Sequence, residues 1–202
     1  MREILNELLA AYESEGAAMA TVVQTWRSAP RPAGASMLVT ASGEAVGSVS
    51  GGCVEGALFE VGTEVLTDGH PRFEHYGVSD DDAFAVGLTC GGILEVFVEQ
   101  VNQDTWPELP DIAARIERGD PVGVATIIKG PHFVGRHLVI TPESSTGSLG
   151  TDRLDDTVRE DALGMLAAGL TGTIEYGPAG ERLGEGLSVF MASFAPPAQM
   201  FV

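Results

Sequence analysis

Apolar residues recur along this chain with two periods, one typical of helices and one typical of strands. From Val54 to Leu66 they lie three or four positions apart, on one face of a helix. Elsewhere, short runs rich in Val, Ile, Thr and Phe are continuously apolar or alternate with polar residues, as strands do. The predicted helices are 2–14, 54–66, 106–118 and 154–166, and the predicted strands are 18–25, 36–40, 72–78, 93–100, 122–129, 137–141, 171–176 and 187–194.

The predicted elements occur in the same order twice, about 100 residues apart, which indicates an internal duplication. Four short matches support the repeat: Ala20–Val23 with Ala125–Ile128, Gly47–Val49 with Gly147–Leu149, Tyr76–Gly77 with Tyr176–Gly177, and Val96–Phe97 with Val189–Phe190. We therefore predict an α/β fold with two related lobes, each a mixed β-sheet covered by helices. The expected divisions are a first repeat over 1–103, a second over 104–195 and a linker remnant over 196–202.

Composition narrows the class of protein. A hydrophobic content of 44% with 20% charged residues is typical of a folded chain. No apolar run approaches the roughly 20 residues that span a bilayer, and the acidic N-terminal segment does not resemble a signal peptide. We therefore expect a cytoplasmic protein whose two cysteines are thiols, too few for a closed four-ligand zinc site. With 29 acidic and 11 basic residues, nucleic acids and anionic membranes are poor partners.

Both cysteines lie in glycine-rich segments of the first repeat. One segment is Gly51-Gly52-Cys53, at the start of a predicted helix, and the other is Cys90-Gly91-Gly92. Glycine lets a ligand approach the main chain closely, and the N-terminal end of a helix favours anions such as a phosphate or a thiolate. A small buried thiol in a tight turn explains the same pattern equally well.

The duplication helps to separate these two interpretations. Ser50–Cys53 in the first copy corresponds to Gly150–Arg153 in the second, and GLTCGG corresponds to ERLGEG. A turn needed only for folding should keep its residues in both copies. The difference therefore favours a ligand site at the two cysteine loops, with the second copy as a scaffold or a partner surface.

Several other polar residues are candidates for the same site. Arg27 and Arg31 form a basic loop in an otherwise acidic chain. Glu55 lies in the first turn of the predicted helix, where stabilising the helix is its default role and proton transfer near Cys53 the lesser alternative. The run 80–82, three aspartates, suits a solvated loop better than a cation site, and we interpret the four histidines as structural.

Three segments, WRSAPRPAGASMLV, GEAVGSVSGGCVEGAL and VGLTCGGILEVFVE, resemble the N-terminal domain of the XdhC/CoxI family. Members of this family are accessory proteins for xanthine dehydrogenase and carbon monoxide dehydrogenase. The resemblance covers essentially the whole chain and is strongest over residues 18–100. A threonine, Thr89, stands before Cys90 where the family pattern suggests glycine. The family usually continues into a Rossmann-type domain, and we expect the tail 196–202 to be the remnant of the linker to it.

The resemblance implies that the chain binds molybdenum cofactor (molybdopterin) transiently, assists its sulfuration and delivers it to an apo-molybdoenzyme. Implied partners are that apoprotein, a cysteine desulfurase or sulfurase, and a second copy of the chain in a homodimer. The expected cofactor-binding residues are Arg27, Arg31, Gly34, Ser50, Gly51, Gly52, Cys53, Glu55, Cys90, Gly91 and Gly92, with Cys53 and Cys90 as possible contacts of the metal. The alternative is a thiol-dependent enzyme or sulfur carrier that uses either cysteine.

Overall fold

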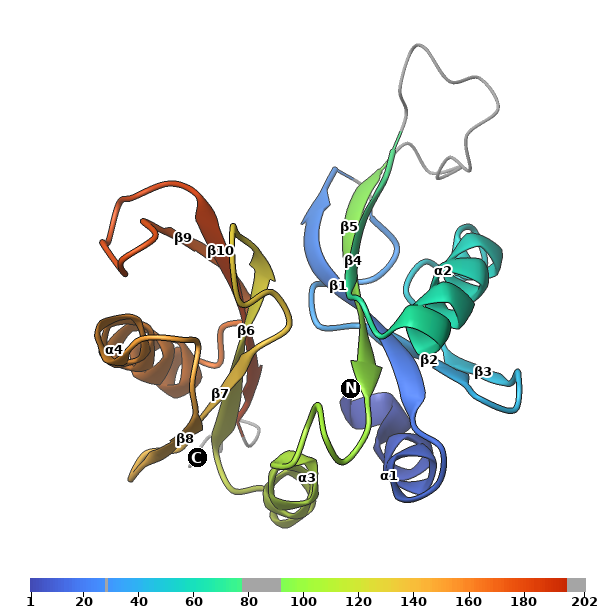
Figure 1. Ribbon diagram of the computed structural model, residues 1–202, viewed down its shortest axis with the longest axis horizontal. Helices are drawn as coiled ribbons and strands as arrows, with labels where there is room; N and C mark the ends of the chain where they lie inside the picture. Colours follow the sequence, from blue (N-terminus) through green and yellow to red (C-terminus); the bar gives the residue numbers. More distant parts are fainter. Residues whose placement is uncertain (28, 78–91, 196–202) are drawn as a thin grey trace, which may run out of the picture. The chain divides into compact units, whose positions relative to one another are not determined.

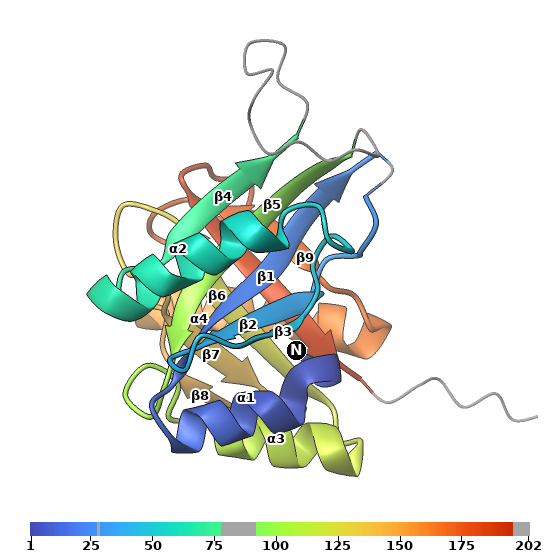
Figure 2. The same ribbon diagram turned by 90° about the vertical axis from the view of Figure 1, so that its right-hand side faces the viewer.

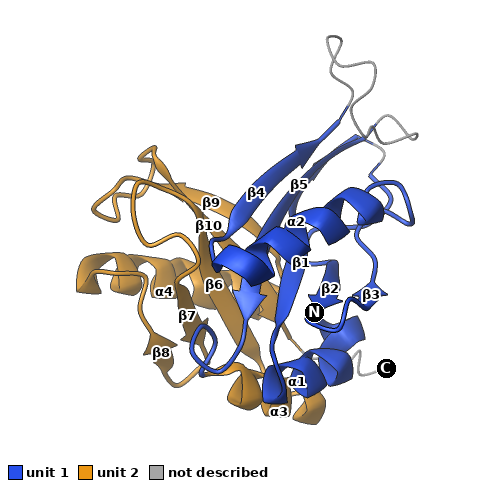
Figure 3. Cartoon of the chain, turned by 45° about the vertical axis from the view of Figure 1, so that its right-hand side comes forward, with its two compact units in different colours: residues 1–107 blue, residues 108–202 orange. Residues whose placement is uncertain are grey.

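A computed structural model describes residues 1–27, 29–77 and 92–195 of the 202-residue chain. The chain divides into two compact units, Met1–Pro107 and Glu108–Val202, which Figure 3 shows in different colours. The expected α/β class with two related lobes is confirmed, because each unit contains a five-stranded sheet and a long helix. None of the described helices is both long enough and apolar enough to cross a bilayer.

Unit 1 begins with a helical segment and continues into its sheet. In chain order its elements are η1 (Arg2–Ile4), α1 (Leu5–Glu13), β1 (Ala17–Trp26), β2 (Ser36–Thr40), β3 (Ala45–Gly47), α2 (Glu55–Asp68), β4 (Arg72–Tyr76) and β5 (Ile93–Val101). The strands are ordered β3-β2-β1-β5-β4 across the sheet (Figure 2). The helix α2 carries the chain from one edge of the sheet to the other, where β4 and β5 then form an antiparallel pair.

All four ladders of this sheet are antiparallel, so the expectation of a mixed sheet was wrong in this respect. The physical reason is the position of the crossover. β3 and β4 run in the same direction, but three strands lie between them, so they do not pair. A parallel pair would require the strands on either side of the crossover to be neighbours.

One face of the first sheet packs against α2 (Figures 1 and 2). Alternate residues of β1, such as Ala18, Ala20 and Val22, meet Leu58 and Val65 of the helix in a common apolar core. The period of two in the strand and the spacing of apolar residues in the helix produce this match. Close approach is possible because the helix carries glycine at position 62, where a Cβ would lie 2.8 Å from Cγ2 of Val39.

Unit 2 repeats this arrangement. Its elements are α3 (Leu109–Arg118), β6 (Val122–Lys129), β7 (His137–Ile140), β8 (Ser145–Gly147), α4 (Asp152–Ala168), β9 (Gly172–Tyr176) and β10 (Leu187–Phe194). The strand order β8-β7-β6-β10-β9 corresponds strand for strand to that of unit 1, and again every ladder is antiparallel. The helix α4 packs on one face of the sheet, as α2 does in unit 1.

The duplication extends to an irregularity in the long strands. In β1 the register shifts between Val22 and Gln24, and in β6 it shifts between Ile127 and Lys129. These positions match under the alignment that the sequence predicted. The extra residue reverses which side chains face the helix, so Trp26 lies opposite Ile93 on the sheet face away from α2. Trp26 is consequently 40% exposed rather than part of the core beneath α2.

Candidate functional site

The described residues that carry or flank the predicted site loops lie at one end of unit 1, which we call the loop end. There β1 ends at Trp26 opposite the first residue of β5, Ile93, and β4 ends at Tyr76 opposite Leu94. The helix α2 is oriented with its N-terminus toward this end. Its C-cap, Gly69, lies near the side chain of Gln100, close to the opposite end of β5.

The carboxylate of Glu55 organises the Cys53 loop, which we define as residues 47–55. It accepts hydrogen bonds from Ser48 Oγ at 2.7 Å, Val49 N at 3.1 Å, Ser50 N at 2.9 Å, Gly52 N at 2.9 Å and Val54 N at 3.2 Å, and from Ser50 Oγ. Two hydroxyls complete the network. Ser48 Oγ accepts from Gly51 N at 2.9 Å, and Ser50 Oγ accepts from Cys53 N at 3.0 Å. Ser48 was not among the predicted site residues, although its repetition at position 148 was a usable signal.

This network alters the expected role of the loop. Partial burial acts to raise the pKa of Glu55, but the hydrogen bonds from Ser50 and Ser48 outweigh it and lower the pKa to about 2. Glu55 is therefore a fixed anion at the N-terminal end of α2. Its carboxylate uses the N–H groups that we expected to bind a phosphate, so that part of the sequence interpretation is corrected.

The outer side of the Cys53 loop is open. Gly51 and Gly52 have positive φ angles of 75° and 112°, and no described atom lies within 4 Å of a Cβ placed at either residue. These glycines are required by backbone conformation rather than by crowding. Cys53 is half-buried and packs against the core beneath α2, as do Ala29 and Ala35 of the loop between β1 and β2. The Cys53 side chain and the β1–β2 loop thus pack against the same apolar core beneath α2.

The equivalent loop of unit 2 is held by different residues. There Asp155, the counterpart of Glu55, accepts from Leu149 N at 2.7 Å, and Thr151 caps α4 through Leu154 N at 3.3 Å. The ring of Phe133 lies over Gly150, where a Cβ would come within 2.4 Å of it. The guanidinium of Arg136 in turn lies 4.4 Å from the centre of that ring. Gly150 corresponds to Ser50, and the positions of Gly51 and Gly52 are occupied in unit 2 by Thr151 and Asp152, which are exposed. What distinguishes unit 1 is therefore the pair of bare glycines followed by a thiol.

Of the two predicted basic residues, Arg31 is held in an ion pair and Arg27 is exposed. Arg31 forms an ion pair with Glu3 of η1, and its Nε is buried without a hydrogen-bond partner among the described residues. Gly34 donates its N–H to the carbonyl of Val22, and its own carbonyl accepts from the N-terminal amine. Arg27 is exposed, with a left-handed φ of 60° that turns the chain directly after β1. Of the two arginines, Arg27 is the more available to a ligand.

The second cysteine segment lies mostly outside the described residues. Cys90 and Gly91 belong to the undescribed stretch, as do the aspartates at 80–82, and Gly92 is buried just before β5. The described residues on either side of this stretch, Gly77 and Gly92, follow β4 and precede β5 at the loop end. The prediction that Cys53 and Cys90 share a ligand remains a prediction.

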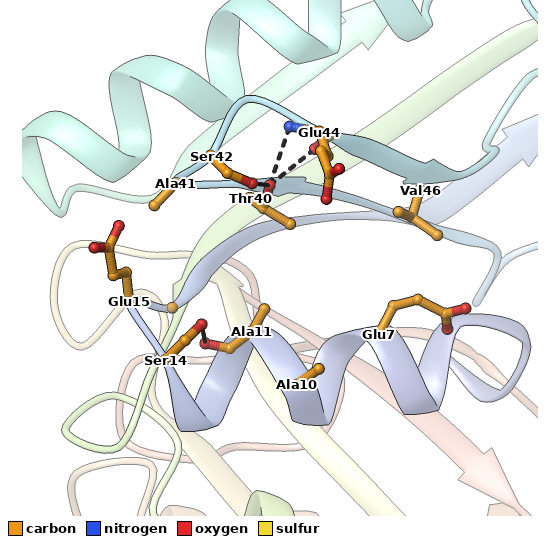
Figure 4. Close-up of a pocket in the computed structure, with 11 residues that line it drawn as sticks. Glu7, Ala10, Ala11, Ser14, Glu15, Thr40, Ala41, Ser42, Glu44 and Val46 are labelled. Carbon is orange, nitrogen blue, oxygen red and sulfur yellow. Dashed lines mark hydrogen bonds between the residues drawn. The ribbon is translucent and has the colours of Figure 1, made fainter.

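A separate groove of about 480 Å³ lies in unit 1 between α1 and the β2–β3 hairpin (Figure 4). Glu7, Glu15 and Glu44 are among its lining residues, and the others are small or uncharged. Three carboxylates disfavour an anionic ligand. This groove is therefore a poorer site for a phosphate-bearing molecule than the loop end. Across the described residues, no group of three or more His, Cys, Asp or Glu side chains is arranged to hold a metal ion.

Fold and site together define a class of protein, a duplicated α/β chain with a thiol-bearing glycine loop in only one copy. The XdhC and CoxI family model matches residues 10–77 and 115–177, one segment in each unit, and the chain belongs to this family. The resemblance seen in the sequence is thereby confirmed.

Several known proteins are similar to the chain. A protein of Bacillus subtilis, named as a probable subunit of xanthine dehydrogenase, is 31% identical over 151 residues, covering 73% of this chain and 44% of the relative. The molybdenum cofactor insertion chaperone PaoD of Escherichia coli is 34% identical over 110 residues, covering 54% of this chain and 34% of the relative. A crystal structure of a xanthine dehydrogenase from Bacillus halodurans matches 96% of this chain and 52% of that one, with a TM-score of 0.68 and 22% identity, which shows the shared fold. The chain thus spans about half or less of the length of these proteins.

Proposed function

We propose that unit 1 binds molybdenum cofactor at its loop end and delivers it to an apo-molybdoenzyme of the xanthine dehydrogenase type. Two similarities support this function. One relative is named as a molybdenum cofactor insertion chaperone and another as a probable subunit of xanthine dehydrogenase. The observation that carries the proposal is the difference between the copies at equivalent positions: unit 1 has the exposed glycines Gly51 and Gly52 followed by the Cys53 thiol, where unit 2 has Thr151, Asp152 and Arg153.

The residues present fit part of this cofactor well. The uncovered main chain at Gly51 and Gly52 admits a flat pterin edge, because no described side chain obstructs it. The thiol of Cys53, and that of Cys90 in our prediction, suit a soft metal centre. Glu55 is a positioning residue that holds the loop rather than a ligand of the cofactor. When bound, the cofactor supplies the molybdenum centre at which the target enzyme performs its redox chemistry.

The phosphate of the cofactor requires a cation rather than the helix N-terminus. Glu55 already engages the loop amides, and its negative charge repels a second anion placed there. Arg27 is exposed and begins the loop between β1 and β2. We assign the phosphate contact to Arg27, whereas Arg31 holds Glu3 and is better explained as a structural residue.

Sulfuration is the second part of the proposal. The chain holds the cofactor while a separate cysteine desulfurase or sulfurase supplies sulfur, and a second copy of the chain is the expected partner in a dimer. Mixing the cofactor-loaded chain with apo-dehydrogenase, with and without a sulfurase, tests this role. Full activation of the dehydrogenase without the sulfurase, from unsulfurated cofactor, would contradict it.

Cofactor binding is tested by measuring the pterin that co-purifies with the chain, as fluorescence after oxidation. We expect about one pterin per wild-type chain, and at least tenfold less for Cys53→Ala, which corresponds to about 1.4 kcal/mol of binding free energy. Arg153→Ala, at the equivalent position of unit 2, is the matched control and should retain the wild-type amount. Equal retention by Cys53→Ala, Cys90→Ala and the wild type would make both thiols structural. A persulfide on Cys53 with catalytic turnover would instead favour the thiol-dependent enzyme.

A further inference from the structure

Unit 2 contains an apolar groove at the C-terminal end of α4, which we call the α4 groove. Its volume is about 550 Å³, within the range of roughly 300–1,000 Å³ in which proteins bind small ligands. Leu163, Leu166 and Ala167 of the helix line it together with Pro121, Pro142 and Ala195, and its remaining lining residues are also small and uncharged. Pro142 and Ala167 are exposed, so the groove is open to solvent.

The duplication shows that this apolar character is specific to unit 2. The helices α2 and α4 end at equivalent positions, with C-caps at Gly69 and Gly169. On α2 the corresponding helix face carries Thr63, Glu64, Thr67 and Asp68. That polar face is what a solvent-exposed helix normally presents. At the equivalent positions α4 carries Leu163, Gly164, Ala167 and Ala168. The fold does not require apolar residues at these positions, because α2 occupies the same place in the same fold with polar ones.

The chain itself supplies a suitable occupant. Ala195 lines the groove, and the residues that follow it are Pro-Pro-Ala-Gln-Met-Phe-Val, positions 196–202, which carry no charged side chain. Seven residues reach at most about 25 Å, whereas the helix from Leu163 to Gly169 rises only about 9 Å. The segment is long enough to cover the groove. Because it is tethered at the groove, its effective concentration there is on the order of millimolar.

We propose that residues 196–202 dock in the α4 groove of the same chain, with Met200 and Phe201 as its apolar anchors. Burial of these side chains against Leu163 and Leu166 supplies the driving force, and no charged side chain of the segment has to be desolvated. The two prolines restrict the free segment and so reduce the entropy lost on docking. This inference is independent of the proposed cofactor function.

The test uses the full chain with ¹³C-labelled methionine and leucine methyl groups, and a Met200→Ile variant assigns the Met200 signal. Docking predicts a Met200 methyl shift displaced from its random-coil value and a nuclear Overhauser contact with Leu163 or Leu166. Ala167→Asp places a charge in the groove at an exposed position, so the fold should persist while the contact is lost. Thr67→Asp, the equivalent change on α2, should leave the Met200 signal unchanged.

Three results would overturn the proposal. The first is a random-coil Met200 methyl signal without any contact to the groove in the unmodified chain. The second is a Met200 signal whose displacement depends on protein concentration, which would make a second copy of the chain the occupant. A displaced signal that Ala167→Asp does not change would also exclude the α4 groove as the docking site.

Discussion

The backbone N–H of Gly52 donates a hydrogen bond of 2.9 Å to the carboxylate of Glu55. A side chain in the first turn of α2 thereby holds the loop that precedes the helix, in a manner related to a capping box. The same carboxylate also holds Ser48, Val49 and Ser50. The position of the Cys53 thiol therefore depends on one ionised residue two positions further along the chain.

Replacing Glu55 should loosen this loop. We expect Glu55→Ala to lower the free energy of unfolding by about 1–3 kcal/mol, because several main-chain donors lose a charged acceptor. Urea denaturation followed by circular dichroism measures the change. Asp155→Ala is the matched control in unit 2, and we expect a smaller loss since Asp155 accepts one described backbone hydrogen bond in that loop. Equal losses of unfolding free energy in the two variants would show that the additional hydrogen bonds of Glu55 do not stabilise the protein further.

The stabilising effect of Glu55 should depend on pH. Its pKa falls from 4.5 to about 2 on folding, so its contribution is complete above about pH 4.5 and disappears as the pH falls toward 2. The difference in unfolding free energy between the wild type and Glu55→Gln should therefore narrow over this interval. Urea titrations of both proteins at pH 7, 4 and 3 measure that difference. A constant difference would mean that the carboxylate charge is not the source of the stability.

Glycine in the middle of α2 should be needed for packing. Gly62→Ala places a methyl group 2.8 Å from Val39 Cγ2. We expect a net loss of about 1–2 kcal/mol, since overpacking outweighs the higher helix propensity of alanine. Gly164→Ala provides the control, because no described atom lies within 4 Å of the added Cβ. That variant should be stabilised by up to about 1 kcal/mol, as measured by thermal or urea denaturation. Stabilisation by both changes would show that α2 can move away from the sheet.

The loop after β9 should depend on Asp161. Its carboxylate accepts from the hydroxyl of the buried Tyr176 at 3.0 Å and from Nε of Arg182 at 3.0 Å. We expect Asp161→Ala to cost about 1–2 kcal/mol and to increase amide hydrogen exchange in β9 and in residues 177–186. Glu160→Ala removes a more exposed partner of Arg182 and should cost under about 0.5 kcal/mol. Unchanged exchange in Asp161→Ala would show that this contact does not anchor the loop.

Much of the fold was readable from local patterns. The strands 36–40, 122–129 and 187–194 were predicted with the bounds that the structure shows, and the remaining long elements differ by a few residues. The strands β3 and β8 were not predicted, because three residues are too few to show a period of two. Strand direction was also beyond local patterns, since it depends on which strands become neighbours in the sheet.

The candidate site was only partly predictable. Sequence reasoning placed Cys53 on a glycine turn before a helix and gave Glu55 a helix-stabilising role, and both are seen in the structure. It assigned the loop amides to a phosphate because it could not show that Glu55 folds back over them. It also treated Arg27 and Arg31 alike, although only Arg31 meets Glu3, a residue 28 positions away.

By itself, the sequence determined the duplication, the order of the elements, the family and the difference in chemistry between the two glycine loops. These properties depend on residue identity, spacing and repetition, which can be read along a single chain. The tertiary structure decided that Phe133 packs over Gly150, 17 positions away, and that the carboxylate of Glu55 accepts hydrogen bonds from the loop amides. Such contacts join residues that no local pattern relates, and they form only when the strands and helices pack together.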